Sequence, residues 1–313
     1  MSPNRYQVLC ILSDVRSGST LVGQLLGAHS KIVSVGELQW LRAYALNDRR
    51  LYNPPHEMLC ACGETFADCS FWQAVAARIS EPLSDLHFKP ELFEWSGPGA
   101  RRQALHRRIP RRIVERYPDL YRSRIVQQIF GGARVATNNM EVFDAIFEQT
   151  NARYFVDMSK NIFRFRSIYD GYGSSLKIVI LHRDYRAVTH SKMKRGVSLE
   201  EAAGKWANKV YEIRALTAGI PAENIVQMKY EDLCTDPKSE LLRLCNYLNL
   251  EFEESMMSRP TEGIHDLGGS PSKLEPERKE IRLDTAYQQA FSDGQLEQIR
   301  RIVGSAADIC GYD

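Results

Sequence analysis

The sequence predicts an α/β fold in which a mainly parallel β-sheet is covered by helices on both faces. Short runs of branched apolar residues alternate along the chain with longer segments whose apolar residues recur at helical spacing. The runs are apolar throughout, which is typical of parallel strands that are buried on both faces. Alternation of the two kinds of segment favours a parallel sheet over separate helical and β-sheet domains.

The expected elements can be justified in chain order. The run Val8–Leu12 belongs to a first strand, and the segment after Gly18 has an amphipathic helical pattern. Asp184 begins a later helix, and Pro237 stands at the start of another. Strands are expected at residues 6–12, 154–156, 176–181 and 225–230, with a further short apolar run at 32–35. Helices are expected at 18–28, 70–80, 110–130, 138–150, 184–194, 199–218, 238–248 and 293–309.

The 313 residues are expected to form a single domain, 1–313, in which residues 45–150 are a helical insertion. A net charge of +2 gives no global reason to expect a nucleic-acid or membrane partner. The first apolar run is too short for a signal peptide or a transmembrane segment. We therefore expect a soluble, cytoplasmic protein.

The segment from Val8 to Leu21 has the most informative pattern in the chain. A strand, a tight polar loop and the first turn of a helix would direct several backbone N–H groups at one point, where an anion can bind. A nucleotide P-loop would have glycine at position 13 and lysine at 19, but this chain has Ser13 and Ser19, and Arg16 supplies the positive charge. Such a P-loop-like site suits a terminal group with less charge than a γ-phosphate, such as a sulfate.

A second candidate anion site follows the strand at 176–181. Arg183 leaves the end of this strand, and Ser191 follows about two helical turns later, with Arg195 one turn beyond. Arginine offers several planar donors to a phosphate, and the serine hydroxyl adds a neutral one.

Ligands of parallel α/β sheets bind beyond the carboxyl ends of the strands. This rule brings four segments together around one crevice, although they are far apart in the sequence. They follow residue 12, Asp157, Leu181 and Tyr230.

These motifs resemble those of sulfotransferases that use 3′-phosphoadenosine-5′-phosphosulfate (PAPS). Arg16–Leu21 resembles their 5′-phosphosulfate loop, and Arg183–Ser191 resembles their 3′-phosphate motif. Val156–Lys160 is similar to the family's D-x-S-K string and Tyr230–Leu233 to its Y-E-D-L string. His265–Pro271 resembles an H-x-x-G-G-N-P loop of bacterial members, with Ser270 in place of asparagine.

The resemblance implies a sulfotransferase fold, PAPS as the donor, 3′,5′-ADP as the product and no metal requirement. The residues it assigns to the cofactor are Arg16, Ser17, Gly18, Ser19, Thr20, Leu21, Arg183, Ser191, Arg195, Tyr230 and Ser270. The segment Ala28–Glu37 looks like one in tyrosylprotein and carbohydrate sulfotransferases, where the glutamate is the base. Glu37 is thus the expected base and His29 the alternative.

Sulfuryl transfer also needs a positive charge beside the leaving oxygen. Lys160 resembles the lysine with this role in the family, and lysine is a compact cation suited to one developing oxyanion. Arg16 is expected to hold sulfate oxygens.

The acceptor is not specified by these motifs. A small molecule, a sugar, a lipid and a peptide all remain open, whereas no nucleic-acid recognition motif is present. Residues 101–124 contain nine arginines and two acids, which fits an acceptor wall, a solvated helix face or a contact in a homodimer. Trp40 and Tyr44 are candidate pocket residues.

Seven cysteines allow several interpretations. Cys60, Cys62 and Cys69 cluster near His56 and are either structural thiols, a disulfide or metal ligands. The other four, Cys10, Cys234, Cys245 and Cys310, have the sequence context of buried small hydrophobic residues.

Two other functions remain as alternatives. A P-loop nucleotide kinase or phosphotransferase is disfavoured because Ser19 stands where the P-loop lysine would be. A degenerate family member that only binds the nucleotide is disfavoured by the presence of Glu37 and Lys160.

Overall fold

A parallel sheet forms the centre of the molecule. The computed structural model describes residues 7–54, 57–83, 85–86, 88, 132–173, 176–260, 262–274 and 280–313. In this part of the chain five strands form one sheet, in the order β2-β3-β1-β4-β5, and every pairing is parallel. The strands are β1 (Gln7–Ser13), β2 (Ile32–Ser34), β3 (Tyr154–Asp157), β4 (Leu176–His182) and β5 (Ile225–Lys229). The predicted α/β class is confirmed.

The central position of β1 determines where the loops meet. Cys10 of β1 pairs with Asp157 of β3 on one side and with Ile178 of β4 on the other. The loop that leaves β1 therefore emerges between the carboxyl ends of two neighbouring strands, where α/β proteins bind their ligands.

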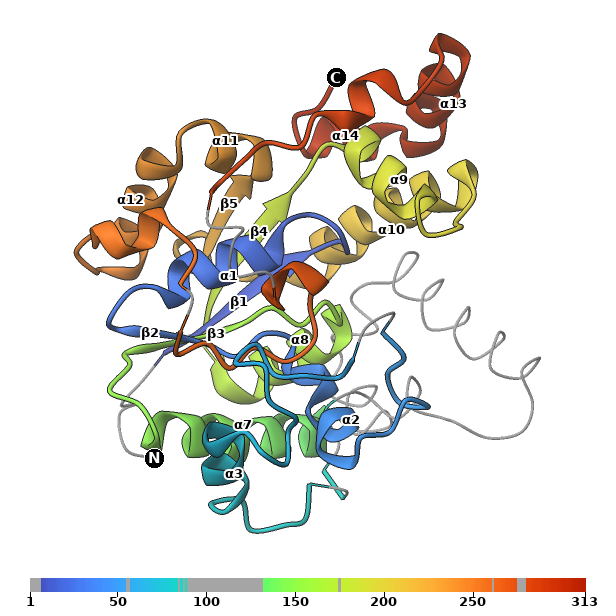
Figure 1. The fold of residues 1–313 in the computed structure, drawn as a ribbon. Helices are drawn as coiled ribbons and strands as arrows, with labels where there is room; N and C mark the ends of the chain where they lie inside the picture. Colours follow the sequence, from blue (N-terminus) through green and yellow to red (C-terminus); the bar gives the residue numbers. More distant parts are fainter. Residues whose placement is uncertain are drawn as a thin grey trace.

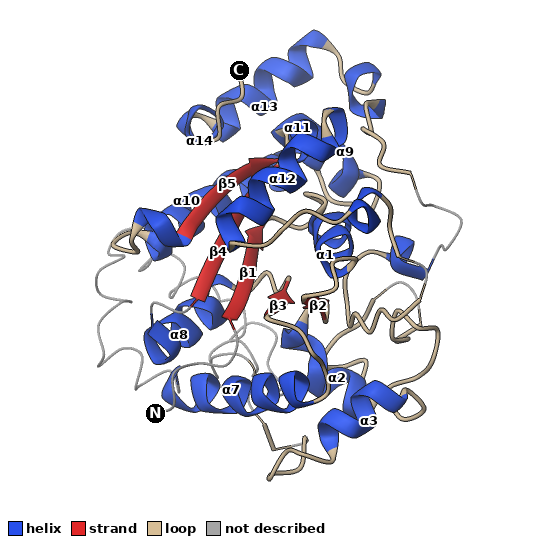
Figure 2. Ribbon diagram, turned by 90° about the vertical axis from the view of Figure 1, so that its left-hand side faces the viewer, coloured by secondary structure: helices blue, strands red, loops and turns tan. Residues whose placement is uncertain are grey.

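Alternate residues of β1 enter two different hydrophobic cores. Val8, Cys10 and Leu12 join the core that contains residues of α7 (Gly132–Glu148) and α8 (Ile162–Tyr172). Leu9 and Ile11 join the core that contains residues of α1 (Ser19–Gly27) and α12 (Pro237–Leu248). This two-residue period follows from the pleat of a strand, and it shows that both faces of the sheet are covered. Figure 2 shows helices on both sides of the strands.

The described part of the chain contains α-helices, most of them close to predicted positions. They are α1 (Ser19–Gly27), α2 (Leu41–Leu46), α3 (Ser70–Ala76), α7 (Gly132–Glu148), α8 (Ile162–Tyr172), α9 (Tyr185–Met193), α10 (Leu199–Thr217), α11 (Tyr230–Thr235), α12 (Pro237–Leu248), α13 (Asp293–Val303) and α14 (Ser305–Ile309). Short 3₁₀ turns are η1 (Leu38–Trp40), η4 (Ala222–Asn224), η5 (Glu254–Met257), η6 (Pro271–Leu274) and η7 (Ala286–Gln289).

Some boundaries differ from the sequence-based expectation. The predicted last helix is two helices, because Gly304 has φ of 51° and ψ of −137° and so ends α13. Tyr230 begins α11 instead of ending β5, and α2, α8 and α11 were not predicted. The expected helix at 110–130 lies outside the described residues.

The C-terminal helices form a third core with α9 and α10. Ile299 and Val303 of α13 and Ala306 of α14 are buried against Trp206 of α10. Figure 1 shows this group at the end of the molecule opposite α3 and α7. Among the described helices, none is both long and apolar enough to cross a membrane.

Candidate functional site

A cavity of about 1130 Å³ opens at the carboxyl edge of the sheet. Each of the five strands is followed by a residue that lines it. In strand order from β1 to β5 these residues are Gly18, Glu37, Lys160, Arg183 and Tyr230. The predicted meeting of four segments at one crevice is confirmed, and the segment after β2 joins them.

The loop after β1 has the shape of an anion-binding turn. Arg16 has φ of 71° and Gly18 has φ of 90°, so both lie in the left-handed region of the backbone. A Cβ atom on Gly18 would overlap the ring of Tyr230, which explains why glycine is needed at this position. Gly18, Ser19, Thr20 and Leu21 line the cavity at the start of α1, where the helix dipole favours a negative charge.

Arg183 connects the β1 loop to the end of β4. Its Nη1 donates to the carbonyl oxygen of Arg16 at 3.0 Å, and its guanidinium lies 4.4 Å from the centre of the Tyr230 ring. Nη2 lies 3.5 Å from a carboxylate oxygen of Asp284. The buried Nε has no hydrogen-bond partner among the described residues, so one donor of this arginine remains for an oxyanion.

Two predicted cofactor residues are not at the cavity wall. Ser17 and Ser191 are absent from the lining formed by the described residues. Ser17 is buried, and the Ser191 hydroxyl accepts a hydrogen bond of 2.9 Å from Nε of Arg16. Ser191 therefore orients an arginine that lines the cavity, and Arg195, just beyond α9, lines it directly.

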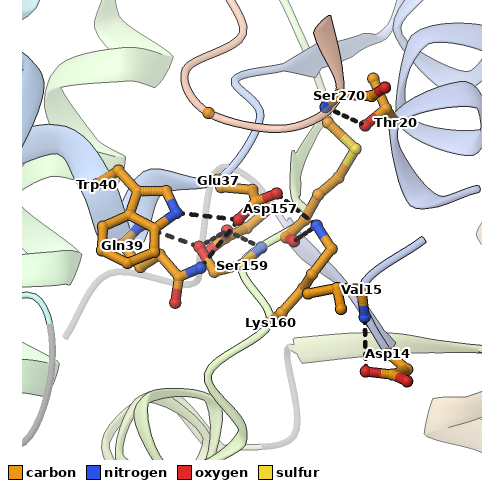
Figure 3. A network of polar contacts seen from close by, with 12 residues as sticks. Asp14, Val15, Thr20, Glu37, Gln39, Trp40, Asp157, Ser159, Lys160 and Ser270 are labelled. Carbon is orange, nitrogen blue, oxygen red and sulfur yellow. Dashed lines mark hydrogen bonds and ion pairs between the residues drawn. The ribbon is translucent and has the colours of Figure 1, made fainter. Parts of the chain in front are cut away.

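Glu37 and Lys160 form an ion pair in the wall of the cavity (Figure 3). Nζ of Lys160 lies 2.5 Å from Oε1 of Glu37, and the side chains are only 11% and 10% exposed. Oε2 of Glu37 accepts hydrogen bonds of 3.0 Å from Nε2 of Gln39 and from Nε1 of Trp40. Both carboxylate oxygens thus accept hydrogen bonds, as an ionised carboxylate does.

A chain of polar contacts leads from the core to this pair. Arg164, 1% exposed, donates to Asp157 and to Asn139, each at 2.5 Å. Asp157 accepts from the Ser159 hydroxyl at 2.5 Å, and that hydroxyl accepts from the backbone N–H of Gln39 at 3.0 Å. The D-x-S-K string therefore positions both Lys160 and the residue that holds Glu37.

The loop at residues 262–274 packs against the segment that carries Glu37. The backbone N–H of Glu37 donates to the carbonyl of Leu267 at 2.7 Å, and the N–H of Leu267 donates to Val35 at 3.0 Å. A Cβ atom on Gly36 would overlap the backbone of Leu267. Farther along this loop, the N–H of Ser270 donates to the Thr20 hydroxyl at 3.2 Å, and Ser270 lines the cavity.

Sequence reasoning missed several cavity residues, and four of its candidates are absent from the lining formed by the described residues, namely Ser17, His29, Tyr44 and Ser191. Gln39, Tyr52, Arg259, Arg282 and Asp284 line the cavity without having been predicted. The last three lie in segments with little regular pattern, so periodicity gave no signal.

Of the two aromatic candidates, one lines the cavity and the other does not. Trp40 lines the cavity and stacks on Tyr52 at 4.2 Å between ring centres. Tyr44 is buried behind the wall, where its hydroxyl accepts from the N–H of Gly268 at 3.0 Å. Burial raises the pKa of Tyr44 to about 12.

His29, the alternative base, lies outside the cavity. Its Nδ1 accepts from the N–H of Lys31 at 2.9 Å, and Nε2 lies 2.8 Å from the carbonyl of Glu251. Nδ1 is therefore the acceptor and Nε2 the protonated nitrogen, and both are occupied by the backbone. His29 is a structural histidine. The arginine-rich segment 101–124 lies outside the described residues.

Comparisons with known proteins point to one family. The sequence model described as the sulfotransferase family matches residues 9–254. A search among curated proteins gave no match.

Solved structures with a similar fold have low sequence identity. The sulfotransferase domain of the Synechococcus PCC 7002 olefin synthase is 18% identical with a TM-score of 0.57, covering 100% of this chain and 98% of that one. The sulfotransferase domain from the curacin biosynthetic pathway is also 18% identical, with a TM-score of 0.54 and coverage of 100% and 99%. Sulfotransferase STF9 from Mycobacterium avium is 12% identical, with a TM-score of 0.51 and coverage of 99% and 78%.

Proposed function

The chain belongs to the sulfotransferase family, and from this premise we propose that it transfers a sulfuryl group from PAPS to an acceptor hydroxyl or amine. One observation carries the proposal. Arg16 and Arg183, from segments far apart in the sequence, line the same cavity as the Glu37–Lys160 pair. The cavity thus combines an anion-binding side with an acid–base pair.

The residues present suit the charge and size of this donor. The cavity of about 1130 Å³ exceeds the usual range of small-ligand pockets and leaves room for a nucleotide and an acceptor. The cradle at Gly18 and the guanidinium of Arg183, whose Nε has no partner in the part of the chain that the structure describes, suit two separate anionic groups. In our proposal Arg16 and the start of α1 hold the 5′-phosphosulfate, whereas Arg183 and Arg195 hold the 3′-phosphate. Ser191 acts through Arg16, and Tyr230 supports Arg183.

The proposed reaction needs one proton acceptor and one cation. The donor supplies the sulfuryl group, whose bond to the bridging phosphate oxygen breaks as its bond to the acceptor oxygen or nitrogen forms. Glu37 takes the proton that the acceptor loses. Lys160 offsets the negative charge that develops on the bridging oxygen, which leaves with 3′,5′-ADP. Positive side chains thus provide the charge compensation, and the proposed reaction requires no metal ion.

The hydrogen bonds to Glu37 suit a base that must stay oriented. Gln39 and Trp40 both donate to Oε2, which fixes the plane of the carboxylate. Oε1, which contacts Lys160, is the oxygen we assign to proton removal. Since Trp40 and Tyr52 line the wall beside this oxygen, the acceptor would approach along an aromatic surface.

Nucleotide binding tests the first half of the proposal. Isothermal titration calorimetry should detect binding of 3′,5′-ADP, with much weaker binding of 5′-ADP and of ATP with Mg²⁺. Hydrogen bonds to a charged group contribute about 1.5–3 kcal/mol, so Arg183→Ala should weaken 3′,5′-ADP binding by about 10- to 150-fold. Arg301→Ala, an exposed arginine of α13, is the matched control and should bind normally. Equal affinity for 3′,5′-ADP and 5′-ADP would contradict the proposed 3′-phosphate site.

Turnover tests the second half. The full chain is incubated with ³⁵S-labelled PAPS and a panel of sugars, phenols, lipids and peptides, and transfer of label is measured. Transfer to any class identifies the acceptor. Nucleotide binding without transfer or donor hydrolysis would favour a binding module, and phosphate transfer from ATP would favour a kinase.

A further inference from the structure

Three cysteines and one histidine gather at one point outside the cavity. Cys60, Cys62 and Cys69 come from the segment before α3, and His265 comes from the loop at 262–274. The four candidate ligand atoms lie within 4.8 Å of one another. The Cys62 and Cys69 sulfurs are 3.6 Å apart, and those of Cys69 and Cys60 are 3.8 Å apart. Nδ1 of His265 lies 3.4 Å from the Cys69 sulfur and 3.8 Å from that of Cys60.

The four distances just given lie close to those of a tetrahedral zinc site and far exceed a disulfide bond. Zn–S bonds of about 2.3 Å and Zn–N bonds of about 2.0–2.1 Å place tetrahedral ligand atoms about 3.6–3.8 Å apart. A disulfide needs two sulfurs at about 2.05 Å, and all three cysteines have free thiols. One metal ion would contact all four atoms, whereas a disulfide would leave one thiol and the imidazole unused.

The backbone around the cluster holds the four side chains in place. The backbone carbonyl of Cys60 accepts from the N–H of Gly63 at 2.9 Å, and Gly63 has φ of 92°, so the chain turns sharply between Cys60 and Cys69. The His265 ring stacks on Phe71 at 4.5 Å with an angle of 3°. Nε1 of Trp72 donates to the His265 carbonyl at 2.9 Å. These contacts keep Nδ1 of the imidazole directed at the sulfurs.

We propose that Cys60, Cys62, Cys69 and His265 bind one structural Zn²⁺ ion. All four positions are filled by protein, so the site would be closed, as structural zinc sites are. Three thiolates and one Zn²⁺ leave one net negative charge. Lys273, buried, donates to the carbonyls of Leu59 and Asp266 at 2.9 and 3.1 Å, which places an ammonium group beside the cluster to balance that charge.

The proposed ion would connect two segments that support the functional site. The N–H of Ala61 donates to the carbonyl of Asp266 at 3.1 Å, and the next carbonyl, of Leu267, accepts from Glu37. Zinc would therefore fix the loop at 262–274 against Glu37 and against Thr20 through Ser270. The ion would contribute to folding of this region without contacting the substrate.

Sequence spacing offered a different histidine as a partner for these cysteines. His56, four residues before Cys60, was that candidate, and it lies outside the described residues. His265 is 205 residues from Cys60 and 196 from Cys69, so spacing could not identify it.

Metal analysis of the purified full chain tests the proposal independently of sulfuryl transfer. Inductively coupled plasma mass spectrometry of protein made in zinc-containing medium and purified without chelators should find about one zinc per chain. A mercurial reagent that blocks thiols should release it. Replacement by Co²⁺ should give the intense near-ultraviolet charge-transfer and red d–d absorption of a tetrahedral thiolate site.

Variants assign the ligands. Cys62→Ser and His265→Ala should reduce bound zinc several-fold at least, whereas Cys310→Ala, which removes a buried thiol in the third core, should keep it. Less than one zinc per ten wild-type chains, or a disulfide among the three cysteines on peptide mapping, would overturn the proposal. Loss of zinc from Cys310→Ala as well would assign it to other ligands. Failure of the sulfotransferase proposal would leave the metal content unchanged, so the two results are separable.

Discussion

Two carboxylate–lysine pairs of the same length lie close to the cavity but have different surroundings. Glu37–Lys160 and Asp14–Lys192 both have an N···O distance of 2.5 Å. Their side chains are similarly covered, at 10% and 11% exposed for the first pair and 9% and 5% for the second. The first pair lines the cavity, whereas the second joins the β1 loop to α9 and is not part of the lining formed by the described residues.

The two pairs differ in what surrounds the carboxylate. Glu37 accepts two further side-chain hydrogen bonds at the cavity wall. Asp14 accepts from the N–H of Val15 at 2.8 Å, within the loop itself. Burial raises the pKa of the Asp14 carboxyl and lowers the pKa of Lys192, although each partner opposes the shift of the other.

In the Asp14–Lys192 pair the loss of hydration thus has a larger effect on both pKa values than the attraction between the two charges. The pair fixes the conformation of the β1 loop, and its burial costs solvation free energy. Distance alone therefore does not distinguish a catalytic candidate from a structural ion pair. Access to the cavity and the surrounding hydrogen bonds distinguish the two kinds of pair. The two pairs should therefore respond differently to substitution.

The largest expected effect is on the rate, at the cavity pair. Glu37→Gln keeps the shape of the side chain but removes the base, so the transfer rate should fall by about 10²–10⁴-fold. Affinity for 3′,5′-ADP, measured by calorimetry, should stay within about threefold, because the proposed phosphate contacts are made elsewhere.

Glu240→Gln is the matched control for this change. Glu240 forms a 2.5 Å pair with Arg243 on α12 and is 15% exposed, but it lies outside the cavity lining. It should retain the full rate. A Glu37→Gln protein with normal turnover would remove the distinction between the two lysine pairs.

The next effect is on stability, at the buried pair. Lys192→Met leaves Asp14 buried without its cation, so the free energy of unfolding should fall by about 3–5 kcal/mol. Adding Asp14→Asn removes the remaining charge and keeps an acceptor for Val15, so the double variant should regain most of this loss. Urea denaturation of the wild type, both variants and Asp14→Asn alone gives the free energies of unfolding for a complete double-mutant cycle. A loss below about 1 kcal/mol in Lys192→Met would show that the buried pair is dispensable.

The sequence was sufficient for features that depend on neighbouring residues. The apolar run of β1, the glycine after it and the start of α1 lie within a few residues of one another, so pattern and turn chemistry predicted them. The sheet class followed from the alternation of elements. The convergence of loops followed from topology, since parallel strands end at the same edge.

Features that depend on distant contacts were not predictable in this way. Gln39 and Ser159 are joined by a hydrogen bond but are 120 residues apart in the sequence. The ion-paired residues Glu37 and Lys160 are 123 residues apart. Helix α8 was missed because Arg164 is buried in it and disguises the apolar face. The resemblance to a family, and not spacing, selected Glu37 and Lys160 from the many acids and lysines of the chain.

The smallest expected effect concerns His182, a half-buried histidine that lies beside a cation instead of a carboxylate. Burial lowers the pKa of His182, at the end of β4, and the nearby Lys229 lowers it further, although a hydrogen bond with Gln227 opposes the shift. In the unfolded chain this histidine regains its ordinary pKa of about 6.5. Between these two values the unfolded chain binds more protons than the folded one, so stability is present above about pH 6.5 and is lost as the pH falls through it.

His182→Gln removes this titration, so its free energy of unfolding should decrease less than that of the wild type between pH 7.5 and 5.5. This effect should be smaller than those expected at the two lysine pairs, because the hydrogen bond with Gln227 offsets part of the shift in the pKa of His182. Urea denaturation of both proteins at several pH values measures the difference, in which the shared titration of the carboxyl groups cancels. If the two pH profiles run parallel, His182 has the same pKa in the folded and unfolded chains, and burial beside a cation does not perturb it.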